Sequence, residues 1–355
     1  MSGGSLVAAN VLSTLSSRRS ALRLVAMNSV ADEAILSDYD EVWLTSEIDR
    51  SDEFATRFAD VVSATKPDLI VPTRDTDVAW LASYQQGAPQ QHHKLLCGAV
   101  RIANAMLDKL DSAELARELD LPFAETVGCT DHQRLREFAK KHGFPLIAKP
   151  RCGFASRGVR VVVRAEQLGW LSGRDDYVVQ EYLGNHARVA AHVASEEAEG
   201  IALFHSLEEI KISLQANIDS NGNVTSSIAT RNTMLLGKSV SVSRETSADT
   251  QALTRRSAGA FAVAGWRGPI NVQCQRGPDG QLKIFEFNGR FTGATSARRW
   301  LGHDEVGDTL RHWLGWQSDG DSSYFAETIF RRSADASVNE EMRSVLNERL
   351  HWVRE

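Results

Sequence analysis

Residues 149–163 of the chain read KPRCGFASRGVRVVV, and this stretch carries the strongest signal of the fold. A lysine closes an apolar strand, a loop of Gly, Ser and Arg follows, and a second apolar strand comes next. Such a loop can bring backbone N–H groups and a hydroxyl close to polyphosphate, while Lys149 points a compact charge at it. Because no Gly-Lys-Ser/Thr follows and the next element is β rather than α, the loop is not of the Walker A type. A hairpin loop with a solvated lysine has the same composition, so the phosphate interpretation needs support from other segments.

A second signal comes at residues 178–183, which read VVQEYL and are followed by Gly184. The apolar strand runs into Glu181 and then leaves its sheet. A backbone amide and carbonyl freed at that point can pair with the edge of adenine, and the carboxylate can accept a hydrogen bond from the exocyclic amine. The alternative is an edge strand with a surface glutamate, which this segment alone does not exclude.

The third signal is a pair of runs, residues 270–275 (INVQCQ) and 282–290 (LKIFEFNGR). Both alternate with a period of two, and the Gly-Pro-Asp-Gly sequence at 277–280 is a strong turn signal. Together they predict a β-hairpin.

The length of the turn decides which polar side chains of this hairpin meet. A two-residue turn places Gln273 opposite Glu286, and it places Asn271 opposite Asn288 on the same face. Carboxylate and amide oxygens gathered in this way suit Mg²⁺ held jointly with phosphates. A three-residue loop with a bulge would shift the register by one and leave Gln273 opposite Phe285, and the turn propensity does not decide between the two. Polar residues on a solvated sheet face are a further alternative.

Two other lysines carry no functional prediction by themselves. Lys109 lies in the sequence MLDKL, within a helical pattern that runs from Val100 to Leu119, and taken alone it is a surface lysine. Lys283 falls on the strand face opposite Glu286 if the strand alternates regularly, so we expect it outside the site.

The composition excludes several classes of function. The 46 acids and 40 bases give a net charge of -6, so there is no global basic field for nucleic acid. The four cysteines lack CxxC spacing, which disfavours a disulfide scaffold and a structural zinc site and favours a reducing compartment. No stretch reaches the about 18 uncharged apolar residues of a membrane helix. We therefore expect a cytoplasmic protein that binds small molecules and neither nucleic acid nor membrane.

The 355 residues exceed the size at which one hydrophobic core stops growing, so two or three subdomains are expected. Up to about residue 98, short apolar runs alternate with helical patterns, which is typical of a parallel sheet covered by helices. The chain begins like a βα unit without its first strand, because a Gly3-Gly4 turn, a helical stripe and a buried strand at 21–27 follow one another. Later runs predict β structure at 177–182, 189–194, 201–214 and 224–233, and a helix at 338–353.

Together, in this order and at these spacings, the segments resemble the ATP-grasp superfamily, and most of all its carbamoyl-phosphate synthase and biotin carboxylase branch. The resemblance implies a mixed α/β and α+β fold, with a Rossmann-like pre-ATP-grasp domain followed by a two-subdomain ATP-grasp fold. The implied boundaries are 1–98 for the Rossmann-like domain, 99–176 for the small, lid-bearing subdomain, 177–316 for the large subdomain with the metal site, and 317–355 for a C-terminal extension.

The resemblance also implies which residues form the site. A loop from Gly153 to Gly158 would be a mobile lid over the ATP phosphates, and the hinge at 180–183 would hold adenine. The implied ATP ligands are Lys109, Lys149, Gly153, Ser156, Gly158, Gln180, Glu181, Tyr182 and Leu183. The implied ligands of Mg²⁺, for which Mn²⁺ is the substitute, are Gln273, Glu286 and Asn288. The implied catalytic groups are Lys149 and Arg290, which would steady the transferred phosphoryl group.

Two parts of the site are not marked by the family pattern. Many relatives carry a second glutamate after the hinge that binds the ribose hydroxyls, but residues 185–189 contain none, and His186 is the substitute candidate. The substrate site has no motif either. The candidates for binding a small acid or amine are the charged residues Arg74, Asp75, Arg231, Arg298 and Arg299.

The implied reaction is the ADP-forming ligation of a small carboxylic acid to an amine through an acyl phosphate. Metal and cationic side chains would neutralise and align the phosphates, and a closing lid would keep water from the mixed anhydride. One alternative is a catalytically inactive ATP-binding regulatory module of the same fold. Another is an NAD-dependent oxidoreductase, suggested only by the Rossmann-like start. A homodimer is the assembly considered.

Overall fold

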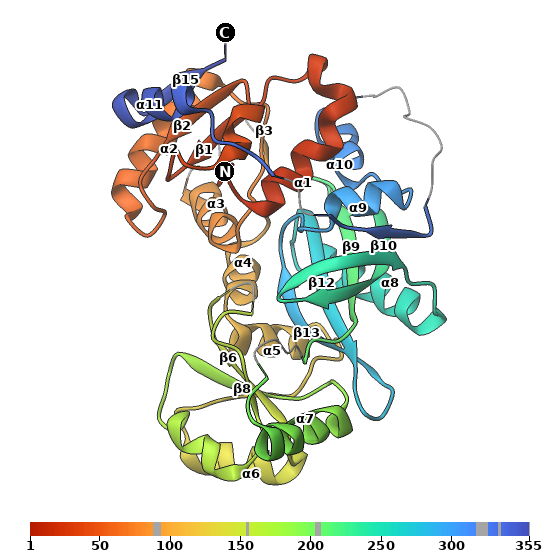
Figure 1. The fold of residues 1–355 in the computed structure, drawn as a ribbon. Helices are drawn as coiled ribbons and strands as arrows, with labels where there is room; N and C mark the ends of the chain where they lie inside the picture. The colour runs from red at the N-terminus through yellow and green to blue at the C-terminus, as the bar shows by residue number, and fades with distance from the viewer. Residues whose placement is uncertain (88–93, 154–155, 203–206, 317–325, 333–334, 355) are drawn as a thin grey trace.

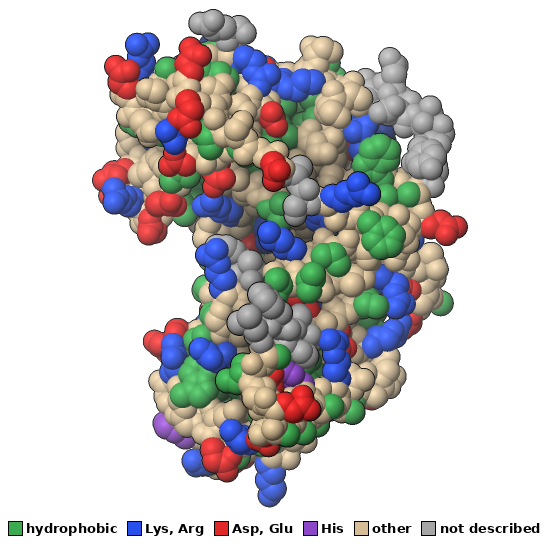
Figure 2. All heavy atoms as spheres, in the orientation of Figure 1, with side chains coloured by type: hydrophobic (Ala, Val, Ile, Leu, Met, Phe, Trp, Pro, Cys, Tyr) green, Lys and Arg blue, Asp and Glu red, His purple; other side chains and the backbone are tan. Residues whose placement is uncertain are grey.

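A computed structural model describes residues 1–355 apart from 88–93, 154–155, 203–206, 317–325, 333–334 and 355. In Figure 1 the N-terminal part of the chain and its last helix lie at the top, a yellow and green unit lies at the bottom, and a blue-green sheet lies between them on one side. Figure 2 shows the surface hollowed on the other side, between the upper and lower parts. Within the described ranges, no helix is long and apolar enough to cross a membrane.

The N-terminal unit contains short strands alternating with helices, as the sequence predicts. Its elements are α1 (Leu6–Leu15), β1 (Val25–Asn28), β2 (Glu41–Leu44), α2 (Ser51–Thr65), β3 (Leu69–Ile70), α3 (Asp75–Gly87) and β4 (Lys94–Leu95). β1 pairs with β2 and β3 pairs with β4, both in parallel. These are two separate sheets rather than one continuous sheet.

The end of the chain returns to this N-terminal unit. Helix α11 (Glu340–Arg349) buries Met342 and Leu346 against Leu36 and Val42, and β15 (His351–Val353) adds to β2 in antiparallel register. The predicted helix at 338–353 is therefore too long at its C-terminal end. It stops because Leu350 adopts a left-handed conformation, with φ 59°, and the chain turns back as a strand.

A small antiparallel sheet forms the lower unit in Figure 1. Its strand order is β5-β8-β6-β7, and helix α6 buries Leu135 and Phe138 against it. The elements of this part are α4 (Val100–Leu107), α5 (Lys109–Glu118), β5 (Thr126–Gly128), α6 (His132–His142), β6 (Leu146–Pro150), β7 (Arg160–Val162), β8 (Tyr177–Glu181) and α7 (His186–Glu199).

Two predictions for this part are wrong in detail. The helix predicted from Val100 to Leu119 is broken at Asp108, which is extended and caps α5 through bonds to the backbone N–H groups of Leu110 and Asp111. The run 189–194, predicted as a strand, lies within α7. Asn185 caps that helix, and alanine and glutamate, which favour helix, fill its later turns.

The large sheet is antiparallel throughout and has the order β13-β12-β9-β10-β11-β14. Helix α8 packs Leu253, Ala258 and Phe261 on the face that forms the main hydrophobic core. The elements are β9 (Lys211–Ile218), β10 (Val224–Leu235), β11 (Lys238–Arg244), α8 (Ala248–Val263), β12 (Gly268–Arg276), β13 (Leu282–Asn288), α9 (Thr295–Trp300), α10 (Glu305–Leu314) and β14 (Thr328–Phe330). Short 3-10 helices lie at Ser16–Ala21, Ala34–Asp38 and Ala165–Trp170.

The turn between β12 and β13 is the three-residue loop that the sequence left as an alternative. The N–H of Gly277 donates to the carbonyl of Gln281 at 2.9 Å, and Gly280 takes the positive φ of 77° that such a loop requires. Gln275 consequently lies opposite Lys283 near the turn.

A bulge further along β13 nevertheless produces the predicted polar pairs. Phe285 has no partner in the register, and beyond it Gln273 lies opposite Glu286 and Asn271 opposite Asn288. A bulge adds one residue to one strand and bends it, so each side of the bulge follows a different register. Both registers considered from the sequence are therefore present.

Candidate functional site

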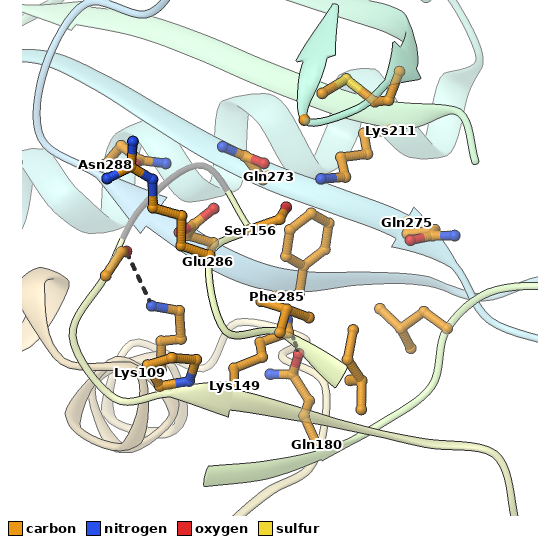
Figure 3. A pocket seen from close by; sticks show the side chains of 18 of the residues that line it. Lys109, Lys149, Ser156, Gln180, Lys211, Gln273, Gln275, Phe285, Glu286 and Asn288 are labelled. Carbon is orange, nitrogen blue, oxygen red and sulfur yellow. Dashed lines mark hydrogen bonds between the residues drawn. The ribbon is translucent and has the colours of Figure 1, made fainter. Parts of the chain in front are cut away.

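A cleft of about 240 Å³ lies between the small sheet and the large sheet. Strands β6 and β8 form one wall, β9, β12 and β13 form the other, and the first residues of α3 and α5 reach it from the ends. Figure 3 shows side chains from both sheets pointing toward one another across it. The predicted site residues that line the cleft are Asp75, Lys109, Lys149, Gly153, Ser156, Gln180, Glu181, Tyr182, Leu183, Gln273, Glu286, Asn288 and Arg290.

Lys149, on β6, is a buried cation without a charged hydrogen-bond partner. It is 8% exposed, and its Nζ donates to Oε1 of Gln180 at 2.6 Å. The pKa of Lys149 is lowered to about 7, chiefly by burial; Glu286 opposes this shift, whereas Lys211 and Lys109 add to it. Because an ammonium is costly to bury beside a neutral amide alone, an anion bound at this point would be strongly favoured.

Two further lysines face the same cleft. Lys109 is the first residue of α5, and its Nζ donates to the carbonyl of Gly153 at 3.3 Å. Lys211 begins β9, and its Nζ lies 5.7 Å from the centre of the Phe285 ring, which Lys149 approaches to 4.8 Å. Lys211 was not predicted, although a lysine that opens a β-rich run is a signal that could have found it. Three lysines around one small cleft make it positive and suited to polyphosphate.

The hairpin places carboxylate and amide side chains on the opposite wall. Glu286 makes no hydrogen bond or ion pair to any residue that the structure describes, and Gln273 lies opposite it. The Asn288 Oδ1 accepts a bond from Arg290 at 2.9 Å, while its buried Nδ2 has no partner within the described residues. An uncommitted carboxylate beside amide oxygens fits Mg²⁺ that is shared with phosphates. Within the described part of the chain, no group of three or more His, Cys, Asp or Glu residues is placed to hold a metal ion.

The bulge at Phe285 turns successive side chains of β13 into the cleft. Phe285 and Glu286 both line it, which regular alternation would prevent. The prediction that Lys283 lies on the face opposite Glu286 is wrong for the same reason. Lys283 pairs with Gln275, a residue of the cleft wall, and its Nζ contacts a carboxylate oxygen of Glu181 at 2.8 Å.

Arg290 connects the cleft to the N-terminal unit. Its guanidinium donates to Oδ2 of Asp75 at 2.7 Å and to Oδ1 of Asn288 at 2.9 Å. Burial lowers the pKa of Arg290, but Asp75 and Glu286 raise it by more, so the guanidinium stays charged. Its buried Nε has no partner among the described residues. An oriented cation with a spare donor thus lies beside the oxygen ligands of the hairpin.

The hinge segment at the end of β8 lines the cleft, but its polar side chains are already engaged. Gln180 bridges Lys149 and the hydroxyl of Thr126, to which its Nε2 donates at 2.9 Å. The Glu181 carboxylate accepts from the N–H of Glu125 at 2.8 Å and pairs with Lys283. Burial raises the pKa of Tyr182 to about 12, so its hydroxyl stays neutral.

Comparison with known proteins agrees with this arrangement. The family model for the ATP-binding domain of the carbamoyl-phosphate synthase L chain matches residues 108–297, more than half of the chain. The chain belongs to this family. No curated protein matches the sequence.

Solved structures share the fold at low sequence identity. The biotin carboxylase domain of Hydrogenobacter thermophilus 2-oxoglutarate carboxylase matches with a TM-score of 0.64 and 16% identity, over 89% of this chain and 69% of that one. The N5-carboxyaminoimidazole synthetase of Staphylococcus aureus, complexed with ADP, matches with a TM-score of 0.66 and 12% identity, over 89% and 76%. The corresponding synthetase of Thermus thermophilus matches with a TM-score of 0.64 and 14% identity, over 89% and 78%. The expected ATP-grasp fold is confirmed.

The predicted ATP-grasp lid is described only at its two ends, because residues 154–155 lie outside the described residues. Gly153 and Ser156 line the cleft, whereas Gly158 does not. Gly158 has a φ of 74°, and a Cβ there would lie 2.9 Å from both the Pro150 ring and the Tyr177 hydroxyl. Glycine is therefore needed where the loop passes over β6.

A carboxylate from another segment lies beside the hinge, after which this ATP-grasp chain lacks the second glutamate that many relatives carry. His186 donates through Nε2 to the carbonyl of Tyr182 at 3.0 Å and does not line the cleft. Glu209, which sequence reasoning missed, also lies outside the lining of the cleft, and it accepts from the N–H of Asn185 at 2.7 Å. A Cβ at Gly184 would lie 2.7 Å from the same Glu209 oxygen, so glycine at the hinge leaves room for this carboxylate. No motif in the sequence connects the two segments.

Of the five charged substrate candidates, only Asp75 lines the cleft. Arg74 is exposed beside α3, and Arg231 is exposed and pairs with Glu245 at 3.3 Å. Arg299 donates to the carbonyl of Thr14 at 2.5 Å, away from the cleft. Arg298 is 0% exposed and donates to Glu305 at 2.7 Å. These four arginines are therefore corrected from substrate candidates to residues outside the cleft.

Proposed function

We propose that the protein is an ATP-dependent, ADP-forming carboxylate-amine ligase that acts through an acyl-phosphate intermediate. The observation that supports this most is the composition of the cleft between the small sheet and the large sheet. Lys109 and Lys149 face Glu286 across it, Lys211 lies on the same wall as Glu286, and Arg290 stands at the end where α3 begins. The chain belongs to the family of carbamoyl-phosphate synthase ATP-binding domains, which supports ATP as the nucleotide.

ATP would lie along the cleft with its adenine at the hinge and its phosphates among the lysines. The backbone of Glu181 to Leu183 would pair with the base, since the Glu181 carboxylate is held by Lys283. Lys149 would gain its missing counter-charge from the phosphates. We propose Glu209 as the ligand of the ribose hydroxyls, because it is fixed at the hinge by the Asn185 N–H.

Gln273, Glu286 and Asn288 would hold Mg²⁺ together with the phosphates, and Mn²⁺ is the metal that we propose as a substitute. When bound there, the metal supplies positive charge that neutralises the phosphate oxygens. Glu286 is the one carboxylate of this set, so it contributes the charge that holds the metal. Asn288 would orient Arg290 through its existing hydrogen bond.

The first step transfers the γ-phosphoryl group to the acid. A carboxylate oxygen forms a bond to γ-phosphorus, and the bond to the bridging oxygen of ADP breaks. Lys149 and Arg290 would neutralise the equatorial oxygens and hold the reactants in line. In the second step the amine nitrogen bonds to the acyl carbon and the carbon–oxygen bond to phosphate breaks. The nitrogen loses its proton, and phosphate leaves.

The acid is proposed to be small, because Arg290 has a spare donor and Asp75, to which it is bonded, also lines the cleft beside it. A bicarbonate anion is present in the similar Hydrogenobacter thermophilus structure, which is consistent with an acid of that size. The four arginines outside the cleft provide no second anion site there. The amine would enter from the side of Asp75, whose carboxylate could accept its proton.

We also propose the division into residues 1–98, 99–176 and 177–316, with residues 340–353 joined to the first unit by β15. A cytoplasmic location and a homodimer are further proposals. The biotin carboxylase domain of Hydrogenobacter thermophilus is described as a dimer, which supports the second.

The test is a screen of pooled small carboxylates and amines for ATP-dependent ADP release. The proposal predicts release that requires both an acid and an amine and that disappears in Glu286→Gln. ATP binding without release against every pool would instead favour the inactive regulatory module. The matched control is Glu137→Gln, an exposed glutamate on α6 that bonds only to Gln133 among the described residues.

A further inference from the structure

The large sheet ends at β14 in an edge with which no other described strand pairs. β14 bonds to β11 on one side and lies last in the strand order. In Figure 1 it is the dark blue strand directly below α9. Its residues, Thr-Ile-Phe, favour strand structure, and it contains no lysine, proline or bulge, which are the features that usually keep an edge strand from pairing. This edge is therefore open to a further strand.

The backbone groups of β14 face alternately toward β11 and away from it. In an antiparallel pair, residues that exchange both backbone bonds alternate with residues that exchange none. The N–H of Arg331 donates to the carbonyl of Val240 at 2.9 Å, so Ile329, two residues earlier, also bonds to β11. The N–H and C=O groups of Thr328 and Phe330 consequently point outward, and no backbone bond between described elements uses them.

Apolar side chains accompany this free edge on both faces of the sheet. Phe330 is 78% exposed. Ile329 points to the opposite face, where it packs beside α9 and stays partly exposed. Trp300, at the end of α9, is 56% exposed, and its carbonyl accepts from the N–H of Ala326 at 3.0 Å, just before β14 begins. Exposed aromatic side chains beside an open edge are typical of a protein–protein contact.

Two opposite charges flank β14, and neither has an ionic partner among the described residues. Glu327 is exposed, and its carboxylate bonds to no described residue. The partly buried guanidinium of Arg331 donates to the carbonyl of Gly293 and to Oδ1 of Asn10, both of them uncharged acceptors. Burial lowers the pKa of Arg331, and Arg298 adds to this shift. A carboxylate beside Arg331 would offset both effects.

A two-fold axis through Ile329 brings these complementary features together. Two antiparallel copies of β14 then pair Thr328 with the partner's Phe330, and each such pair exchanges its outward N–H and C=O groups. Glu327 lies opposite the partner's Arg331, and the two Ile329 side chains face each other. An axis through Thr328 would place Ile329 opposite the partner's Glu327, and an axis through Phe330 would place it opposite the partner's Arg331. The axis through Ile329 avoids both mismatches.

We propose that β14 pairs with β14 of a second copy of this chain, antiparallel and centred on Ile329, so that two six-stranded sheets join into one. The two Phe330 rings then lie diagonally across the axis, within reach of each other. The same surface serves both copies, as a two-fold interface requires. This inference gives a surface to the homodimer proposed above and does not depend on the ligase activity, because it rests on the sheet edge and not on the cleft.

Sedimentation equilibrium of the full chain tests the pairing. The short contact predicts a dissociation constant of about 10 µM, so the mass should rise from 39.1 kDa toward twice that value between about 1 and about 100 µM. Thr328→Pro removes an outward N–H and leaves the bonds to β11 intact, so this variant should stay monomeric with an unchanged thermal midpoint. A monomeric wild-type chain at the highest concentration, or a Thr328→Pro variant that still dimerises, would overturn the proposal.

Two further variants test the register. Glu327→Lys places like charges opposite each other twice and should raise the dissociation constant about tenfold or more. The matched control Glu137→Lys, on α6, should leave it unchanged. Ile329→Cys should form, under mild oxidation, a dimer crosslinked at position 329 of both copies, since that pair lies close to the axis. The wild-type chain, oxidised in parallel, shows any crosslinking through its own cysteines.

A dissociation constant of Glu327→Lys equal to that of the wild-type chain, or the lack of a crosslink at position 329, would overturn the register. ADP release is measured separately in the screen of acids and amines. A chain that is monomeric and still releases ADP would therefore contradict the β14 pairing and leave the ligase proposal standing.

Discussion

Two buried cations of this molecule lie in opposite electrostatic surroundings. Lys149, in the cleft, is 8% exposed and bonds to the neutral amide of Gln180. Arg298, behind the large sheet, is 0% exposed and bonds to Glu305, which is itself 1% exposed. A buried cation with a buried counter-ion has a structural role, because removal of either partner leaves the other charge unpaired. A buried cation without a counter-ion favours the binding of an anionic ligand.

The two carboxylates of these regions differ in the same way. Glu305 accepts two bonds from Arg298, at 2.7 and 3.1 Å, and ties α10 to α9. Glu286 has no bonded partner within the described residues and faces the lysines of the cleft. The comparison therefore predicts that substitution of Lys149 or Glu286 changes activity, whereas substitution of Arg298 or Glu305 changes stability.

The largest expected effect is on catalysis by Glu286→Gln. This change removes the anionic metal ligand while keeping the shape of the side chain, so ADP release at saturating Mg²⁺ should fall about a thousandfold or more. The thermal midpoint should change little, because Glu286 makes no hydrogen bond or ion pair to any residue that the structure describes. Steady-state kinetics and thermal melts measure both quantities.

Glu137→Gln on α6 is the control for this change and should keep turnover within about twofold, as expected for a surface substitution. Lys283→Gln is unsuitable as a control, because Lys283 bonds to Glu181 at the hinge. Near-normal ADP release by Glu286→Gln would place the metal site elsewhere.

The second-largest expected effect is a difference in the free energy of unfolding between variants of Arg298 and Lys149. Arg298→Met leaves Glu305 buried without a counter-ion and should lower the free energy of unfolding by about 3–5 kcal/mol. Lys149→Met removes an ammonium that has no counter-ion, so the free energy of unfolding at pH 6 should stay equal or rise. Urea denaturation of both variants checks this contrast. If Lys149→Met lowered the free energy of unfolding as much as Arg298→Met, the two buried cations would not differ in their structural role.

A smaller effect is the dependence of stability on pH. The pKa of Lys149 is about 7 in the folded chain and returns to its ordinary value of 10.5 on unfolding. Between these values the unfolded state binds more protons, so this lysine makes the free energy of unfolding rise with pH from about 7 to about 10. The difference between the wild-type chain and Lys149→Met, measured by urea denaturation across that window, isolates the contribution. A flat difference would contradict the lowered pKa.

The smallest effect concerns the ribose contact. Glu209→Gln should raise the KM for ATP by a few-fold and leave kcat unchanged, because it weakens a ground-state contact far from the phosphoryl group. Full kinetics with ATP as the varied substrate separate the two constants. A change in kcat without a change in KM would exclude this role.

The parts of the site that lie within one segment could be predicted from the sequence. Lys149 with its loop, the hinge at 180–183 and the facing pair Gln273 and Glu286 all follow from local periodicity and turn signals. The turn type was left open, and the outcome depended on a bulge at Phe285, which packs against two lysines from other segments.

What could not be predicted depends on contacts between distant segments. From its position in the sequence, Arg298 was a candidate for binding an anionic substrate. In the structure it is fully buried and bonded to Glu305. Glu209 reaches the hinge from another segment, and β15 joins β2 from the far end of the chain. Neither is encoded by spacing or by composition.

The central claim is that burial lowers the pKa of Lys149 to about 7 and that a bound phosphate group supplies the counter-charge that keeps this side chain protonated. Calorimetry of Mg·ATP binding at pH 8, in two buffers of different ionisation enthalpy, measures the protons taken up. With a pKa of about 7 the wild-type chain should take up about 0.9 proton per ATP, and Lys149→Arg, which is charged before binding, should take up none. Buffer-independent binding heat in the wild-type chain, or equal uptake by Lys149→Arg, would contradict the claim.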